Sequence, residues 1–168
     1  FRSLSSQGII TSLDPNARSV AVTDKQSYIA RLFRMLPHTC VLKLSDEDLI
    51  YIIPNTSLKD AFNQLCAKTS AELIILTKGA KGALVKTPSY QFQVKAVVPR
   101  PLRDTVGAGD TFMGTILTEL HKRCFVVEEI SKLSYHELRK MVDRASIAAA
   151  LNCQSTGCNP PYENDLLS

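Results

Sequence analysis

Two hydrophobic periods alternate along the chain, one typical of strands and one typical of helices. Short unbroken apolar runs, such as residues 73–76, are typical of strands that are covered on both faces of a sheet. Between residues 90 and 96 apolar and polar side chains alternate one by one, which predicts a half-exposed strand. The predicted strands cover residues 9–13, 39–44, 73–76, 83–85 and 90–96.

Segments with apolar residues at spacings of three and four predict amphipathic helices between these strands. Polar residues that favour helix starts precede most of them: Asp24 is one, and three Ser-x-x-Asp/Glu pairs have the spacing of a capping box. The pairs are Ser45 with Asp48, Ser57 with Asp60, and Ser134 with Glu137. A further core-facing helix is predicted from Met113, Ile116, Leu117 and Leu120.

Strands that alternate with helices predict an α/β sandwich of three layers around a mostly parallel sheet. In such a sheet, ligands bind outside the carboxyl ends of the strands. Asp14, Ser45 and Thr77 each follow a predicted strand, and Gly109 follows the turn that leads into a helix. If the strands are parallel, these four positions share one edge of the sheet and form a candidate site.

Composition narrows the class of protein. The 168 residues suffice for one domain with a sizeable core, and the net charge of +4 is spread along the chain. With 7% aromatic residues and no Trp, binding to nucleic acid is not indicated. No apolar run approaches the roughly 18 residues of a membrane span. Five cysteines, without metal-ligand spacing, are typical of a reduced, cytoplasmic protein.

Residues 104–112, Asp-Thr-Val-Gly-Ala-Gly-Asp-Thr-Phe, are the most informative stretch. Glycines at 107 and 109 let the backbone turn its N–H groups toward one point, and the helix that follows adds its positive end. This arrangement binds an anion, and Asp110 at its edge is placed to accept a proton. The alternative is that Asp110 caps the helix.

This stretch closely resembles the signature of the ribokinase-like (PfkB) family of sugar and nucleoside kinases. The resemblance extends over the whole chain and is closest to the fructokinases. It implies that Gly107, Ala108 and Gly109 form the anion hole for the transferred phosphoryl group and that Asp110 is the catalytic base. It further implies ATP and Mg²⁺ as cofactors, with K⁺ as a possible third, and a sugar as substrate.

The same resemblance bears on the domain. Ribokinase-like enzymes are longer and carry the signature in their C-terminal half, so residues 1–168 are expected to form the C-terminal, nucleotide-binding and catalytic part of one such domain. The part that carries the lid, which often joins two subunits into a homodimer, would then be absent from this sequence.

Asp14, Asn16 and Arg18 follow the first predicted strand as D-x-N-x-R. This pattern resembles a segment of fructokinases and 2-keto-3-deoxygluconate kinases, in which the Arg faces the substrate and phosphate groove. The alternative is a turn held by the Asp and Asn side chains with a solvated Arg.

Ser45 and Asp48 stand where the family usually carries N-x-x-E, a motif tied to magnesium and phosphate placement. Both residues depart from that pattern, so an indirect magnesium role for Asp48 competes with a capping role for the same carboxylate.

Three further segments resemble nucleotide-binding parts of the family. Thr77, Lys78, Gly79 and Gly82 match T-x-G-x-x-G, which lies against the nucleotide; the alternative is a hairpin turn. Ser146 and Asn152 fall in the helix that borders the adenine, where close packing of alanines is the alternative. Asp104 matches the position that helps to hold a monovalent cation.

Other classes remain to be weighed. A Walker-type phosphate loop and a protein-kinase catalytic loop are absent from the sequence. The resemblance leaves three functions open: a fructokinase, a 2-keto-3-deoxygluconate kinase or other ribokinase-like kinase, and a nucleotide-binding fragment without catalytic activity. Asp110 favours a kinase, because a non-catalytic protein would not need the base.

Overall fold

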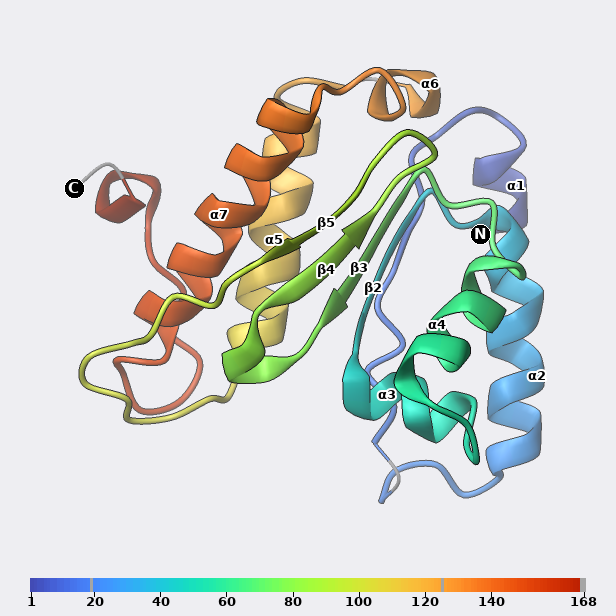
Figure 1. The fold of residues 1–168 in the computed structure, drawn as a ribbon, viewed down its shortest axis with the longest axis horizontal. Coiled ribbons are helices and arrows are strands. Elements are labelled where there is room, and N and C mark those ends of the chain that lie inside the picture. Colours follow the sequence, from blue (N-terminus) through green and yellow to red (C-terminus); the bar gives the residue numbers. More distant parts are fainter. Residues whose placement is uncertain (19, 125, 167–168) are drawn as a thin grey trace.

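The computed structural model describes residues 1–18, 20–124 and 126–166. Its centre is a five-stranded sheet in the order β1–β2–β3–β4–β5 (Figure 1). The strands are β1 (Ser12–Leu13), β2 (Val41–Ser45), β3 (Leu73–Thr77), β4 (Ala83–Lys86) and β5 (Gln91–Val94). The first predicted strand, residues 9–13, is thus shorter than expected.

The sheet is mixed, whereas the sequence predicted a mostly parallel one. β1 pairs with β2 and β2 with β3 in parallel, but β3–β4 and β4–β5 are antiparallel. The cause is local: the segment between β3 and β4 is a tight turn, in which the N–H of Lys78 donates to the carbonyl of Gly82 at 2.7 Å. Such a short connection cannot carry a crossover, so β4 must return alongside β3.

Helices cover both faces of the sheet, which confirms the predicted three layers (Figure 1). On one face lie α2 (Lys25–Met35), α3 (Asp46–Ile52) and α4 (Leu58–Cys66), and on the other lie α5 (Ala108–His121) and α7 (Tyr135–Asn152). Two short helices, α1 (Arg2–Ser5) and α6 (Val127–Ile130), complete the α-helical elements of the described residues.

The core divides into two hydrophobic clusters, one on each face, because successive side chains of a strand point to opposite faces. In β2, Val41 belongs to the cluster under α5 and α7, whereas Leu42 and Leu44 belong to the cluster under α2, α3 and α4. Lys43 lies between these residues and shares the face of Val41. A charged side chain is thereby directed toward α5.

The predicted helix starts are confirmed. The side chains of Asp24, Ser45, Ser57 and Ser134 accept hydrogen bonds from backbone N–H groups in the first turns of α2, α3, α4 and α7. Helix α5 begins differently, at Gly107. All five cysteines are free thiols. Among the described helices, none has the length and apolar character needed to cross a membrane.

Two substitutions in α7 test which side of this helix holds the core. Leu138 is fully buried against the sheet, and the substitution Leu138→Ala should lower the free energy of unfolding by about 2–5 kcal/mol. Ile147 is 40% exposed, so Ile147→Ala should change it by no more than about 0.5 kcal/mol. Urea denaturation measures both, and equal losses would contradict the described packing.

Candidate functional site

The turn before α5 has a backbone that requires glycine. Gly107 has a φ of 77°, in the left-handed region, and a β-carbon at this position would lie 2.3 Å from Sγ of Cys158. The thiol from the C-terminal segment therefore fills the space that a side chain at position 107 would need. The turn and the segment after α7 are packed too closely for any other residue.

This turn leaves backbone donors free at the start of α5. The N–H of Thr111 donates to the carbonyl of Gly107, and that of Ala108 to the carbonyl of Thr105. In the described part of the chain, no acceptor takes the N–H of Gly109 or of Asp110. Free N–H groups at the positive end of a 14-residue helix are a ready anion-binding site.

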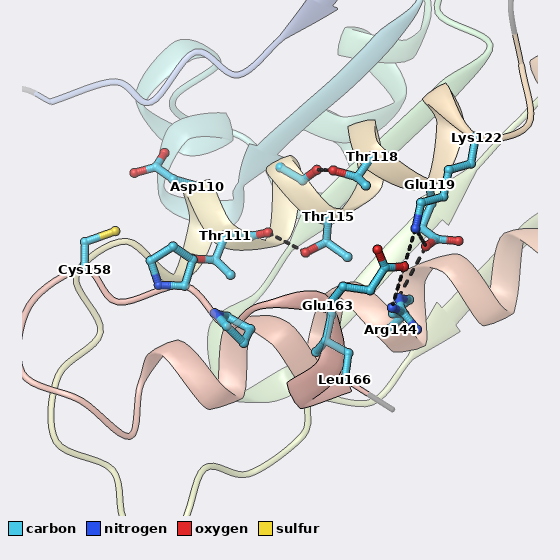
Figure 2. Close-up of a pocket in the computed structure, with 13 residues that line it drawn as sticks. Asp110, Thr111, Thr115, Thr118, Glu119, Lys122, Arg144, Cys158, Glu163 and Leu166 are labelled. Atoms are coloured by element: carbon cyan, nitrogen blue, oxygen red, sulfur yellow. Dashed lines mark hydrogen bonds and ion pairs between the residues drawn. The ribbon is translucent and has the colours of Figure 1, made fainter. Parts of the chain in front are cut away.

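Asp110 lies in the first turn of α5 with an exposed side chain. It lines one end of a cavity of about 400 Å³ along α5, beside Cys158 (Figure 2). At the other end Arg144 pairs with Glu119 at 3.3 Å and with Glu163 at 3.5 Å, which fastens the C-terminal segment to α5 and α7. Of the predicted site residues, Asp110 alone lines this cavity.

The carboxyl ends of the three parallel strands lie at one edge, as the sequence predicted. Ser45 and Thr77 are partners in the β2–β3 register, and Asp14 directly follows β1. The first turn of α5 meets this edge, because a β-carbon on Gly109 would lie 3.0 Å from Nζ of Lys43, a residue of β2. The four predicted positions are therefore brought together.

Lys43 is the residue of this edge that the sequence analysis missed. Its side chain is 7% exposed, and its Nζ donates to Oδ2 of Asp14 at 2.7 Å. Burial raises the pKa of Asp14, Lys43 opposes this shift, and the carboxylates of Asp48 and Asp110 add to it. The signal in the sequence was a lysine inside an otherwise apolar central strand, where a charge is costly without a partner.

The loop after β1 is ordered by a carboxylate from α3. Oδ1 of Asp48 accepts the N–H of Ala17 at 2.7 Å, and its Oδ2 accepts the N–H of Ser45 at 3.0 Å. Asn16 has a left-handed φ of 44°, and both Asn16 and Arg18 are exposed. None of the hydrogen bonds or ion pairs found among residues 1–18, 20–124 and 126–166 involves the side chain of Arg18.

The capping role expected for Asp48 is therefore present, with a complete capping box at α3. The side chain is buried and both oxygens bind N–H groups, which favours this role over a direct contact with a metal ion. An indirect role in magnesium placement stays a prediction.

Two polar side chains, Asp104 and Asn152, anchor the turn at Gly107 to the segment after α7. Oδ1 of Asp104 accepts the N–H of Val106 at 3.0 Å and its Oδ2 accepts that of Gly157 at 2.9 Å. These hydrogen bonds hold the pKa of Asp104 below its ordinary value, the bond from Val106 contributing most. The carboxylate thus closes the loop that carries Gly107.

Asn152, at the end of α7, is fully buried. Its Nδ2 donates to the carbonyl of Val106 and its Oδ1 accepts the N–H of Asn159, both at 2.8 Å. This arrangement favours a positioning role for Asn152 over the direct contact with a nucleotide that the sequence predicted. Ser146, also on α7, is half-buried and donates its hydroxyl to the carbonyl of Val142 at 2.9 Å.

Thr77 to Gly82 form the turn between β3 and β4 at the same edge as Asp14 and Ser45. Gly79 and Gly82 both have left-handed φ angles, and a β-carbon on Gly82 would lie 1.9 Å from the carbonyl oxygen of Val94. Thr77 donates its hydroxyl to the carbonyl of Leu44 at 3.3 Å. The hairpin role of Gly82 is therefore present, and Lys78 and Gly79 lie half-buried and exposed beside it.

With this geometry in place, comparison with known proteins assigns the chain to a family. Residues 5–165 match the pfkB family of carbohydrate kinases, so the chain belongs to this family. A fructokinase of Rhizobium leguminosarum bv. trifolii is 39% identical over 117 residues, which cover 66% of this chain and 33% of that protein.

Solved structures agree with the sequence comparison. A Vibrio cholerae fructokinase in fructose, ADP and calcium ion bound form is 29% identical, with a TM-score of 0.79 over 98% of this chain and 51% of that one. A Xylella fastidiosa fructokinase with bound ATP shares the fold, with a TM-score of 0.82 at 22% identity over 94% of this chain and 49% of that one. The chain therefore spans about half the length of these enzymes or less.

The turn at Gly107 can be tested with a matched pair of substitutions. Gly107→Ala should lower the free energy of unfolding by about 1–2 kcal/mol from the left-handed backbone alone, and the contact with Cys158 should add to this. A β-carbon at Gly114 meets nothing within 4 Å, so Gly114→Ala in α5 should raise it by up to about 1 kcal/mol. Urea denaturation would contradict the described turn if both variants matched the wild type.

The anchor at Asp104 should depend on pH. The pKa of Asp104 is lowered in the folded protein. Its contribution to the free energy of unfolding is therefore complete above the ordinary carboxyl pKa of about 3.9, and is lost as the pH falls through the lower pKa of the folded state. Asp104→Asn should therefore be less stable than the wild type at pH 7, and the difference should shrink below about pH 4. A difference in urea midpoint that stays constant over this range would argue against an ionised anchor.

Proposed function

We propose that the protein containing this chain transfers the γ-phosphate of ATP to a hydroxyl group of a sugar, with fructose as the first candidate. The observation that carries this proposal is an exposed Asp110 beside two free backbone N–H groups at the start of α5. The fructokinase names of its relatives and its place in a carbohydrate kinase family support the choice of reaction.

In this reaction Asp110 would accept the proton of the sugar hydroxyl, which must approach within about 2.6–3.2 Å. The N–H group of Gly109, which belongs to the predicted anion hole of Gly107, Ala108 and Gly109, and the neighbouring N–H group of Asp110 would stabilise the negative charge of the transferred phosphoryl group. The fixed turn keeps these donors oriented, so no backbone rearrangement is needed as the charge develops.

The residues present fit ATP and a magnesium ion that is held mainly by phosphate oxygens and water. No group of three or more His, Cys, Asp or Glu side chains within the described ranges is arranged to hold a metal ion. Mg²⁺ commonly binds phosphates through few protein ligands and keeps several waters, and bound there it would neutralise phosphate charge. Asp48 would at most orient one of those waters, since its side chain is buried and each of its oxygens binds an N–H group.

The nucleotide would lie against the turn formed by Thr77, Lys78, Gly79 and Gly82, which shares the sheet edge with Asp14. Ser146 is kept as a candidate contact on α7. For a monovalent cation such as K⁺, Asp104 is the candidate ligand, because each of its oxygens retains a lone pair beyond its one N–H bond. A related Vibrio cholerae fructokinase has been solved in a potassium ion bound form.

A second candidate substrate is 2-keto-3-deoxygluconate. Asp14, Asn16 and Arg18 keep the pattern that suggested it, and the exposed Arg18 is available to a substrate carboxylate or phosphate.

Five free thiols support a reducing compartment such as the cytoplasm. A homodimer through a lid outside this sequence is part of the same proposal.

The role of Asp110 is tested by Asp110→Asn in the intact enzyme. Turnover should fall by about 10²–10⁴-fold while ATP affinity persists, because the base and the anion-binding N–H groups do separate work. Asp60→Asn is the matched control, since Asp60 also lies in the first turn of a helix but on α4. A coupled kinase assay on a sugar panel gives the rates, and near-normal kcat in Asp110→Asn would refute the assignment.

A further inference from the structure

Lys43 places a buried ammonium group directly beneath the anion-binding turn. Its side chain is 7% exposed, and its Nζ lies close enough to Gly109 that a β-carbon there would be 3.0 Å away. The N–H groups of Gly109 and Asp110, which have no acceptor among the described residues, belong to the same turn. A full positive charge therefore lies beside the partial positive charge of the α5 N-terminus.

This placement is unfavourable unless negative charge is also present. Asp14 supplies one carboxylate, with its Oδ2 2.7 Å from Nζ. The ammonium group has three donors, and Asp14 is the one acceptor that the described residues offer it. Oδ1 of Asp14 is itself buried without a hydrogen-bond partner among the described residues. Both members of the pair thus retain unused hydrogen-bonding capacity at the mouth of the site.

Such a pair is poorly explained by stability alone. Replacing a buried ion pair with apolar residues of similar volume is often neutral or stabilising. Unsatisfied buried polar atoms add a further cost. The Lys43–Asp14 pair lowers the stability of the fold and lies at the edge of the sheet where the predicted site residues converge. A role toward a ligand explains such a pair better than stability does.

The charges around Lys43 come from several elements. Asp14 follows β1, Asp48 lies on α3 and Asp110 on α5, and the two latter carboxylates both act on Asp14. Tyr28 of α2 donates its hydroxyl to the carbonyl of Pro15. Burial raises the pKa of this hydroxyl, and the carboxylates of Asp48 and Asp14 add to the shift. Lys43 is the cation that pairs with this acidic group within the described ranges.

We propose that Lys43, held in place by Asp14, supplies a buried positive charge beneath the Gly107–Asp110 turn and so positions the phosphate group that is transferred. This inference rests on the proposed sugar-kinase function. It makes Lys43 a positioning residue that acts on the anion through the turn and through space, in addition to the backbone N–H groups.

The first test is calorimetric titration of the full chain with ATP and, separately, with adenosine. Lys43→Met keeps the length of the side chain but removes its charge, and should weaken ATP binding about tenfold or more while adenosine binding is unchanged. Lys43→Arg, which keeps the charge, should retain more ATP affinity than Lys43→Met. Lys86→Met in β4 removes a half-buried strand lysine outside the site and should bind both ligands as the wild type does.

The same variants of the intact enzyme separate this inference from the proposed function. Lys43→Met should lower kcat about 10²-fold with little change in the KM for the sugar, because a preorganised charge acts mainly on the transition state. If the wild type phosphorylates no sugar but its preference for ATP over adenosine depends on Lys43, the proposed sugar-kinase function is refuted and the inference about Lys43 is not. An active wild type with Lys43→Met equal to Lys86→Met would refute the inference alone.

Removing only the lysine leaves a buried carboxylate, so Lys43→Met could unfold for a purely structural reason. The double variant Asp14→Asn/Lys43→Met removes both charges and should remain folded. It should still bind ATP at least tenfold more weakly than the wild type, with adenosine unaffected. Recovery of wild-type ATP affinity in the folded double variant, or equal loss for ATP and adenosine, would overturn the proposal.

Discussion

The close approach of the C-terminal segment to the turn at Gly107 is the constraint on which the rest of the site depends. Cys158 fills the space of a missing side chain, and the left-handed backbone at Gly107 directs the chain into α5. With this entry angle, the first turn of α5 meets the carboxyl edge of the sheet beside Lys43. The position of Asp110 and of the two free N–H groups beside it depends on this contact between residues 107 and 158, which lie 51 positions apart.

Hydrogen-bonded polar side chains maintain this approach. Asn152 and Asp104 each bind backbone groups of both the turn and the segment after α7, and Asp48 joins the loop after β1 to the start of α3. These bonds use the side chains that the sequence had suggested as ligands of nucleotide or metal. Two sets of polar residues therefore differ: Asp48, Asp104 and Asn152 fix the backbone, whereas the exposed side chains of Asp110 and Arg18 take no part in this.

Features with a local cause were predictable from the sequence. Helix starts at Ser45, Ser57 and Ser134 depend on contacts within four residues, and the strands follow from hydrophobic period alone. Features that depend on distant partners were not. A lysine inside an apolar strand indicates that Lys43 needs a partner, but nothing local identifies Asp14, 29 residues away, as that partner. The mixed sheet follows from how tightly residues 77–82 turn. The glycines at 107 and 109 together with the family resemblance predicted the anion-binding turn, whereas the burial of Asn152 could be seen only in the packed structure.

Features that lower the stability of the fold gather at the sheet edge near α5, and their position is informative about function. The edge near α5 brings together a buried ammonium group at Lys43, an unsatisfied carboxylate oxygen of Asp14 and a left-handed turn at Gly107. Each of these features costs stability, and departures from local consistency are expected where function requires them. A buried charge beneath the turn would serve nucleotide binding as well as phosphoryl transfer, whereas a protein that only bound a nucleotide would not need the exposed Asp110 beside that turn. Asp110 is therefore the feature that favours the proposed phosphoryl transfer over binding alone.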